Sequence, residues 1–235
     1  MARLDGLGDK RRVHFLHIGK TGGTAIKHAL YGVSTERYEI LLHPHEYRLR
    51  DAPVGDGVFF FLRDPIARFV SGFHSRQRQG LPRAHFPWKR AERVAFSRFS
   101  TPNGLASALS SEDLEEKAAA VSAMNSIGHV KFHYWNWFDD ESYFMSRSED
   151  VLFVGRQETL DEDFERLKAV LGLPAGIALP EDDVESHRNP SDLDTLLDAG
   201  AIENLRSWYR EDYRFGALCD ELFSPARGPA PGARP

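Results

Sequence analysis

The amino-acid sequence predicts an α/β domain in which helices flank a central parallel sheet. Short apolar runs without polar alternation recur at residues 13–18, 58–62 and 151–154, which is typical of parallel strands covered on both faces. Segments with the apolar spacing of helices separate these runs. The chain has 235 residues, a length that suits a single domain of this kind.

The predicted strands and helices alternate along the chain. The strands are expected at residues 13–18, 38–42, 58–62 and 151–154, and the second has the weakest pattern. The helices are expected at residues 24–31, 66–76, 112–126, 160–171, 191–197 and 202–218. Ser191 is expected to cap the fifth of these helices. This alternation predicts a three-layer domain whose ligand lies at the carboxyl ends of the strands.

The composition is that of a soluble protein, with 41% hydrophobic and 28% charged residues and a mean hydropathy of −0.45. We expect one domain over residues 13–223, a flexible N-terminus at 1–12 and a disordered Pro/Gly-rich tail at 224–235. The single cysteine, Cys219, excludes an internal disulfide and a multi-cysteine zinc site. Because the sequence has no long apolar stretch and no leader-like N-terminus, we expect a cytoplasmic protein without a membrane span.

The net charge of −5 conceals two parts of opposite sign. Residues 1–98 hold 18 Lys and Arg against 9 Asp and Glu, whereas residues 99–235 hold 12 against 26. The basic first part predicts an anionic ligand. A pI of about 6.1 argues against nucleic acid as that ligand.

A glycine-rich turn at residues 19–24, Gly-Lys-Thr-Gly-Gly-Thr, lies between the first predicted strand and a helix. Glycines let the backbone approach an anion, and the N–H groups of a helix N-terminus point toward it. Lys20 adds a positive charge, and Thr21 and Thr24 add hydroxyl donors. The pattern predicts a phosphate site, and the alternative is a glycine-rich turn with an incidental lysine. A Walker loop with this lysine would need glycine at position 14, which is His14.

A second strand-to-helix turn follows the predicted strand at residues 58–62. Asp64 and Pro65 suit the N-cap and the first turn of a helix. Arg63 at the strand end and Ser71 on the helix can both reach a group beyond the strand. The alternative is a surface arginine before an ordinary capped helix, but a neighbouring phosphate-type turn favours a second anion contact.

Taken as a pair, these turns resemble those of the sulfotransferases that use 3′-phosphoadenosine 5′-phosphosulfate. Residues 18–24 resemble the 5′-phosphosulfate loop, and residues 63–71 resemble the 3′-phosphate segment. Residues 151–164 resemble a later strand and helix of the carbohydrate-type branch, which includes the heparan sulfate 2-O-sulfotransferases. The resemblance spans about residues 13–215 and implies a single P-loop-like domain.

The resemblance implies a donor nucleotide, an acceptor and no metal. The acceptor would be a carbohydrate or a small, glycosylated metabolite. Lys20 would also neutralise charge on the bridging oxygen as the nucleotide leaves. Two other functions stay open, an ATP-dependent kinase and a non-catalytic nucleotide-binding protein. By the resemblance the 5′-phosphosulfate contacts are Lys20, Thr21, Gly22, Gly23 and Thr24, and the 3′-phosphate contacts are Arg63 and Ser71.

The acceptor hydroxyl needs a base, and residues 41–47 are the best source of one. The carbohydrate-type branch has a His-x-His here, which His43 and His45 match. A histidine has an ordinary pKa of about 6.5, which suits proton transfer at neutral pH. We assign His45 as the base, His43 as its partner or substitute, and Glu46 as a third candidate. The alternatives are solvated loop histidines and a metal-binding pair.

Three further segments each allow two interpretations. Residues 186–191 either begin a helix or contact the donor or acceptor. The basic and aromatic residues at 74–100 either rim the acceptor site or form a solvated surface. The aromatic stretch 129–138 either lines a pocket or packs in the core, and core packing is favoured. The contact candidates in the first segment are His187, Arg188, Asn189 and Ser191.

Overall fold

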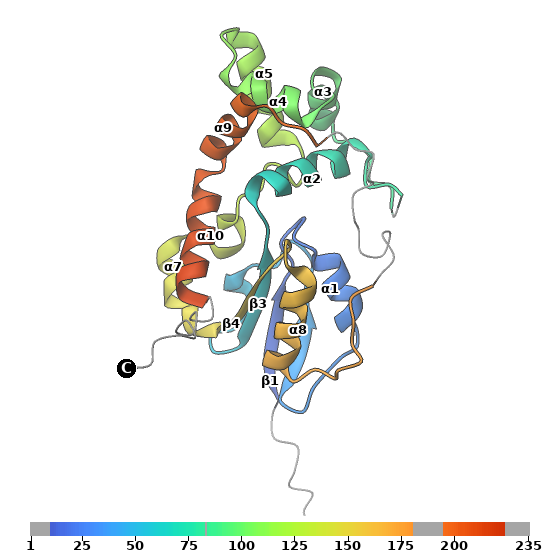
Figure 1. The fold of residues 1–235 in the computed structure, drawn as a ribbon, viewed down its shortest axis with the longest axis vertical. Coiled ribbons are helices and arrows are strands. Elements are labelled where there is room, and N and C mark those ends of the chain that lie inside the picture. The colour runs from blue at the N-terminus through green and yellow to red at the C-terminus, as the bar shows by residue number, and fades with distance from the viewer. Residues whose placement is uncertain (1–9, 83, 181–194, 224–235) are drawn as a thin grey trace, which may run out of the picture.

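The computed structural model describes residues 10–82, 84–180 and 195–223, and within them four parallel strands form one sheet in the order β2-β1-β3-β4 (Figure 1). The strands are β1 (Arg11–Leu16), β2 (Tyr38–Leu42), β3 (Gly57–Leu62) and β4 (Val151–Arg156). This confirms the predicted α/β class and the four expected strands. The first strand begins two residues early because Arg11 and Arg12 pair with β2.

Helices cover both faces of the sheet, as its apolar strands require. On one face, α1 (Gly23–Leu30) and α8 (Leu160–Leu171) pack against Phe15, Phe59 and Phe61. On the other, α6 (Trp135–Phe138), α7 (Glu141–Ser146) and α10 (Arg210–Phe223) pack against Phe60 and Leu62. All six residues of β3 are buried. Each fully buried Val, Phe or Leu side chain stabilises the fold by about 1.5–3 kcal/mol.

A separate helical layer lies beyond the carboxyl edge of the sheet (Figure 1). It shares one apolar cluster, which includes Phe73, Leu105, Met124 and Leu205. Two members of the layer, α3 (Arg90–Arg98) and α4 (Pro102–Ser107), are short helices that the sequence did not predict, as are α6 and α7 on one face of the sheet. The layer consists of α2 (Pro65–Gln77), α3 (Arg90–Arg98), α4 (Pro102–Ser107), α5 (Leu114–Ser126) and α9 (Ala199–Trp208).

The last predicted helices are wrong in their boundaries. The expected helix at 202–218 is two helices, α9 and α10, which meet at Tyr209. The hydroxyl of this buried residue donates to the carbonyl of Val130 (2.7 Å), so a tertiary contact holds the break. Residues 195–198 are not helical, because Asp198 caps α9. Ser191 lies outside the described residues.

Three single-turn 3-10 helices complete the described chain at Leu49–Asp51, Ala108–Ser110 and Ser148–Asp150. Among the described helices, none combines the length and apolar character needed to cross a membrane.

Candidate active site

The glycine-rich turn between β1 and α1 favours glycine at positions 22 and 23, for two different reasons. Gly22 has a positive φ of 84°, as does Lys20 with a φ of 69°. At Gly23 a Cβ atom would lie 2.2 Å from Cδ2 of His17, so a side chain there is excluded. The hydroxyl of Thr21 donates to the carbonyl of Ile18 (3.0 Å) and braces the turn from inside. The turn therefore presents its backbone and the first N–H groups of α1 outward.

Lys20 is a half-buried lysine with further positive charge beside it. Burial, and then the charges of Arg78 and Arg63, lower the pKa of Lys20 to about 7. Burying a charge among like charges costs free energy, which an anion in the same place would offset. The turn is thus poised for a negatively charged ligand.

Arg63 follows β3 and joins the two predicted turns. Its Nη1 donates to the carbonyl of Lys20 (3.4 Å). Its backbone N–H donates to the hydroxyl of Tyr134 (3.0 Å), which in turn donates to the Arg63 carbonyl. Burial lowers the pKa of Arg63. Its Nε is buried and has no hydrogen-bond partner among the described residues, which leaves a donor for a ligand.

Arg68, five residues further on, has a structural function. It is 2% exposed, and its Nε donates to the carbonyl of Gly19 (3.1 Å) while Nη2 donates to that of Phe132 (2.6 Å). Its guanidinium also lies over the rings of Tyr134 and Trp137, at 4.9 and 5.7 Å. Arg68 therefore ties the glycine-rich turn to the aromatic stretch 129–138, in which Tyr134, Trp137 and Phe138 pack in the core, as favoured.

The second turn forms as the sequence predicts. Asp64 caps α2 by accepting the N–H of Ala67 (2.8 Å), and Pro65 is the first helical residue. The backbone N–H of Asp64 donates to Glu158 (2.8 Å), and its second carboxylate oxygen accepts from Tyr213 (2.9 Å). These contacts hold Arg63 between β3 and the loop after β4.

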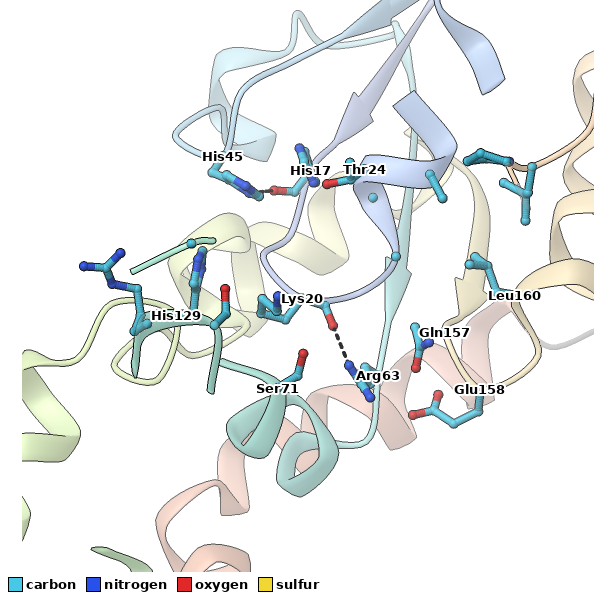
Figure 2. Close-up of a pocket in the computed structure, with 18 of the residues that line it drawn as sticks. His17, Lys20, Thr24, His45, Arg63, Ser71, His129, Gln157, Glu158 and Leu160 are labelled. Carbon is cyan, nitrogen blue, oxygen red and sulfur yellow. Dashed lines mark hydrogen bonds between the residues drawn. The ribbon is translucent and has the colours of Figure 1, made fainter. Parts of the chain in front are cut away.

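A cavity of about 740 Å³ unites most of the predicted site residues. Thr21 is buried behind the turn and does not line it. In Figure 2, His45 and His129 lie on one side of the glycine-rich turn, and Gln157, Glu158 and Leu160 lie on the other. The predicted residues that line the cavity are Lys20, Gly22, Gly23, Thr24, His45, Arg63 and Ser71.

The two histidines after β2 occupy different places. Nδ1 of His45 lies 2.8 Å from the carbonyl oxygen of His17, and Trp137 donates to the His45 carbonyl (2.8 Å). A carbonyl only accepts hydrogen bonds, so Nδ1 carries the proton and Nε2 keeps its lone pair. Burial lowers the pKa of His45. This is the protonation state that a general base needs.

His43 lies away from the cavity. Its Nε2 is 2.9 Å from Nδ1 of His14, and its ring stacks on Tyr47 with centroids 3.5 Å apart. Burial, followed by the charges of His14 and Lys27, lowers the pKa of His43 to about 4. His14 also contacts Asp56 (3.0 Å). Like His43, the exposed Glu46 is not among the residues that line the cavity.

Sequence reasoning did not single out several residues of the cavity. His17 and His129 line it beside His45, and Gln157, Glu158 and Leu160 line the opposite side. Gln157 and Glu158 directly follow β4, so their position after a predicted strand was an available signal. His17 directly follows β1 and carries the same signal, and His129 begins the stretch 129–138, for which pocket lining was one of the two interpretations. The predicted contacts His187, Arg188 and Asn189 lie outside the described residues.

The described residues contain no group of three or more His, Cys, Asp or Glu side chains placed to hold a metal ion. The polar groups that line the cavity include cations, backbone N–H groups and imidazoles.

Open α/β sheets bind ligands at the carboxyl ends of their strands, and here a cavity lined by cations lies at that edge. A family model described as the sulfotransferase family matches residues 7–215, so the chain belongs to that family and is a transferase of sulfuryl groups. A comparison with curated proteins found no match.

Proposed function

We propose that this protein transfers the sulfuryl group of 3′-phosphoadenosine 5′-phosphosulfate to a hydroxyl group of a carbohydrate or small metabolite. The observation that carries the proposal is the buried Nε of Arg63, which has no hydrogen-bond partner among the described residues, next to the half-buried ammonium of Lys20, whose pKa is lowered to about 7. Two such cations in one cavity favour a ligand with two separate anionic groups, as this nucleotide has.

The residues that would bind the nucleotide form two groups, one for each of its anionic ends. The N–H groups at the start of α1, with Lys20 and the Thr24 hydroxyl, would bind the 5′-phosphosulfate. Arg63 and Ser71 would bind the 3′-phosphate, with Nε of Arg63 as one donor. Thr21 would contribute through the backbone it braces. Arg188 and Asn189 stay assigned to the donor as a prediction from the sequence.

The cavity would then have a nucleotide end, lined by Gln157, Glu158 and Leu160, and an acceptor end, lined by His45 and His129. Phe86, whose carbonyl accepts a hydrogen bond from Arg76, belongs to the acceptor end. An in-line displacement needs the attacking oxygen opposite the leaving group. The glycine-rich turn lies between the two ends, so the transferring group would lie between donor and acceptor.

His45 is the proposed base. As the acceptor oxygen forms its bond to sulfur, Nε2 of His45 takes the hydroxyl proton, and the bond between sulfur and the bridging oxygen breaks. The electron pair of that bond stays with the phosphate of the nucleotide, and Lys20 stabilises the added negative charge. His43 acts from outside the cavity, by anchoring residues 43–47 to His14.

Calorimetry with 3′,5′-bisphosphoadenosine and with ATP tests the donor. We expect the bisphosphate to bind in the micromolar range or tighter, and Arg63→Gln to weaken it about 30- to 100-fold by removing a charged hydrogen-bond donor. Arg50→Gln removes the same charge far from the cavity, from an exposed pair with Asp139, and should leave the affinity within twofold.

Tight ATP binding without bisphosphate binding would instead favour a kinase. Bisphosphate binding without transfer of labelled sulfate to any member of a panel of glycans, phenols and other alcohols would favour a non-catalytic nucleotide-binding protein. Full activity of a His45→Ala variant with normal nucleotide binding would remove the base assignment.

A further inference from the structure

His129 is a cavity residue held in a strained backbone conformation. It lies between α5 and α6 and has a φ of 65°. Residues other than glycine and asparagine adopt this conformation at a cost of about 1–3 kcal/mol, and such strain persists where surrounding contacts enforce it. Figure 2 shows its side chain beside His45 and Lys20.

Two glycines make room for His129. A Cβ atom on Gly19 would lie 3.2 Å from Nδ1 of its ring, and one on Gly72 would lie 3.1 Å from its Cβ. Gly19 belongs to the glycine-rich turn and Gly72 to α2, the two segments that carry the predicted anion contacts. The ring therefore packs against the turn, and the backbone of His129 packs against α2.

A buried ion pair holds the backbone just before His129. Glu92 of α3 accepts the N–H of Gly128 (3.0 Å) and two hydrogen bonds from Arg76, at 2.7 and 2.9 Å. Its side chain is 3% exposed. These hydrogen bonds hold Gly128 in place, and they therefore support the strained backbone of the next residue, His129.

The imidazole itself forms no hydrogen bond with any of the residues that the structure describes. Its ring faces that of His45 edge-on, with centroids 6.0 Å apart. Burial, and then the charge of Lys20, lowers the pKa of His129 well below its ordinary value, so the ring is neutral at pH 7. A neutral imidazole has one N–H donor and one lone pair free for a ligand.

We propose that His129 is a second catalytic imidazole, which donates a hydrogen bond to the oxygen of the acceptor hydroxyl and orients it for attack. The inference rests on the proposed sulfuryl transfer. A hydroxyl oxygen has two lone pairs and one proton. His129 occupies one lone pair, the proton points to Nε2 of His45, and the second lone pair is directed at sulfur.

The alternative role for His129 is purely structural, and the neighbouring His133 illustrates it. Nδ1 of His133 lies 3.1 Å from the buried carboxylate of Asp212, and the residue does not line the cavity. The two histidines are four residues apart in the same segment, so they form a matched pair for mutagenesis.

The test compares His129→Asn, His129→Gly and His133→Asn in steady-state sulfate transfer and nucleotide calorimetry. Asparagine and glycine both accept a positive φ, so the His129 variants should fold at least as stably as the native chain. We expect both to lose 10- to 100-fold in kcat/KM for the acceptor, with bisphosphate affinity within twofold. Free imidazole should restore at least part of the activity of His129→Gly, and His133→Asn should keep kcat/KM but unfold at a lower temperature.

Each other outcome has a defined meaning. If the native chain transfers sulfate and His129→Asn keeps kcat/KM within twofold, the role of His129 is wrong and the proposed function stands. If the His129 variants lose nucleotide binding as well, or imidazole restores nothing, the residue is structural. If the native chain neither binds the bisphosphate nor transfers sulfate, the proposed function falls, and the inference falls with it.

Discussion

The nucleotide end and the acceptor end of the cavity use arginine in opposite ways. At the nucleotide end, Arg63 has a buried Nε without a partner among the described residues. At the acceptor end, Arg76 donates twice to Glu92 and once to the carbonyl of Phe86 (3.1 Å). The guanidinium of Arg63 keeps a donor available for an anion. The guanidinium of Arg76 is neutralised by Glu92 and supports the segments that line the acceptor end.

On the proposed function, this difference would let one cavity serve two substrates. The nucleotide would be bound by cations that the fold leaves unsatisfied, at a cost in stability that binding offsets. The acceptor hydroxyl would be bound by neutral imidazoles, beside which Arg76 is paired with Glu92. The binding energy of the donor would then come from charge, and the selection of the acceptor from shape and hydrogen bonds.

The largest effect should come from removing the cation of the glycine-rich turn. We expect Lys20→Met to lower kcat about 10³-fold, because the developing charge on the leaving oxygen loses its stabiliser. The same change should raise the free energy of unfolding by about 1–3 kcal/mol, since it removes a buried charge. Sulfate transfer and thermal unfolding measure the two quantities. If Lys20→Met kept activity within tenfold of the native chain, or lost stability, then Lys20 would not be a catalytic cation that costs stability.

Glu92, at the acceptor end, should stabilise the fold, whereas Lys20 destabilises it. Burial alone would raise its pKa, but hydrogen bonds from Arg76, Lys89 and Gly128 lower it to about 2, from 4.5. A lowered carboxyl pKa contributes stability above the unfolded value, and this contribution is lost as the pH falls from about 4.5 to about 2.

Glu92→Gln should therefore destabilise the fold by about 2 kcal/mol at pH 7 and remove that part of the acid sensitivity. Chemical denaturation between pH 2.5 and 7 measures it, and Glu115→Gln, at an exposed ion pair with Arg98, is the control. If the stability of Glu92→Gln and of the native chain depended equally on pH, the Arg76–Glu92 ion pair would not stabilise this part of the fold.

The smallest expected effect is a pH dependence of nucleotide binding. A bound anion should raise the pKa of Lys20 above about 7, so the affinity is highest below pH 7. It should fall up to about tenfold per pH unit above it. Binding at pH 8 should take up close to one proton, because the phosphates of the ligand are already ionised there.

Calorimetry at pH 8 in buffers of different ionisation enthalpy measures that uptake. Lys20→Arg keeps the charge at all these pH values and should abolish it. Equal proton uptake by the native and Lys20→Arg proteins would show that another group is responsible.

The histidines after β2 show where a sequence pattern stops being informative. The carbohydrate-type sulfotransferases have a His-x-His at this place, so the resemblance alone allowed either His43 or His45 as the base. The chain turns here, with the N–H of Tyr47 donating to the carbonyl of Pro44 (3.3 Å). The turn sends one ring to His14 and the other into the cavity.

The sequence alone determined the strands, the two strand-to-helix turns and the cations they carry. These features depend on neighbouring residues: apolar runs form buried strands, glycine permits a positive φ, and Asp-Pro begins a helix. Strand ends in a parallel sheet also meet at one edge, so two distant turns were predictable as one site.

Only the tertiary structure decided the acceptor end. His129, His45 and Phe86 come from separate loops, and their meeting depends on contacts between residues far apart in the chain, such as Glu92 with Gly128 and Trp137 with His45. The break between α9 and α10 has the same origin, in the bond from Tyr209 to Val130. Local patterns carry no information about such pairings, because they are set by the packing of the whole fold.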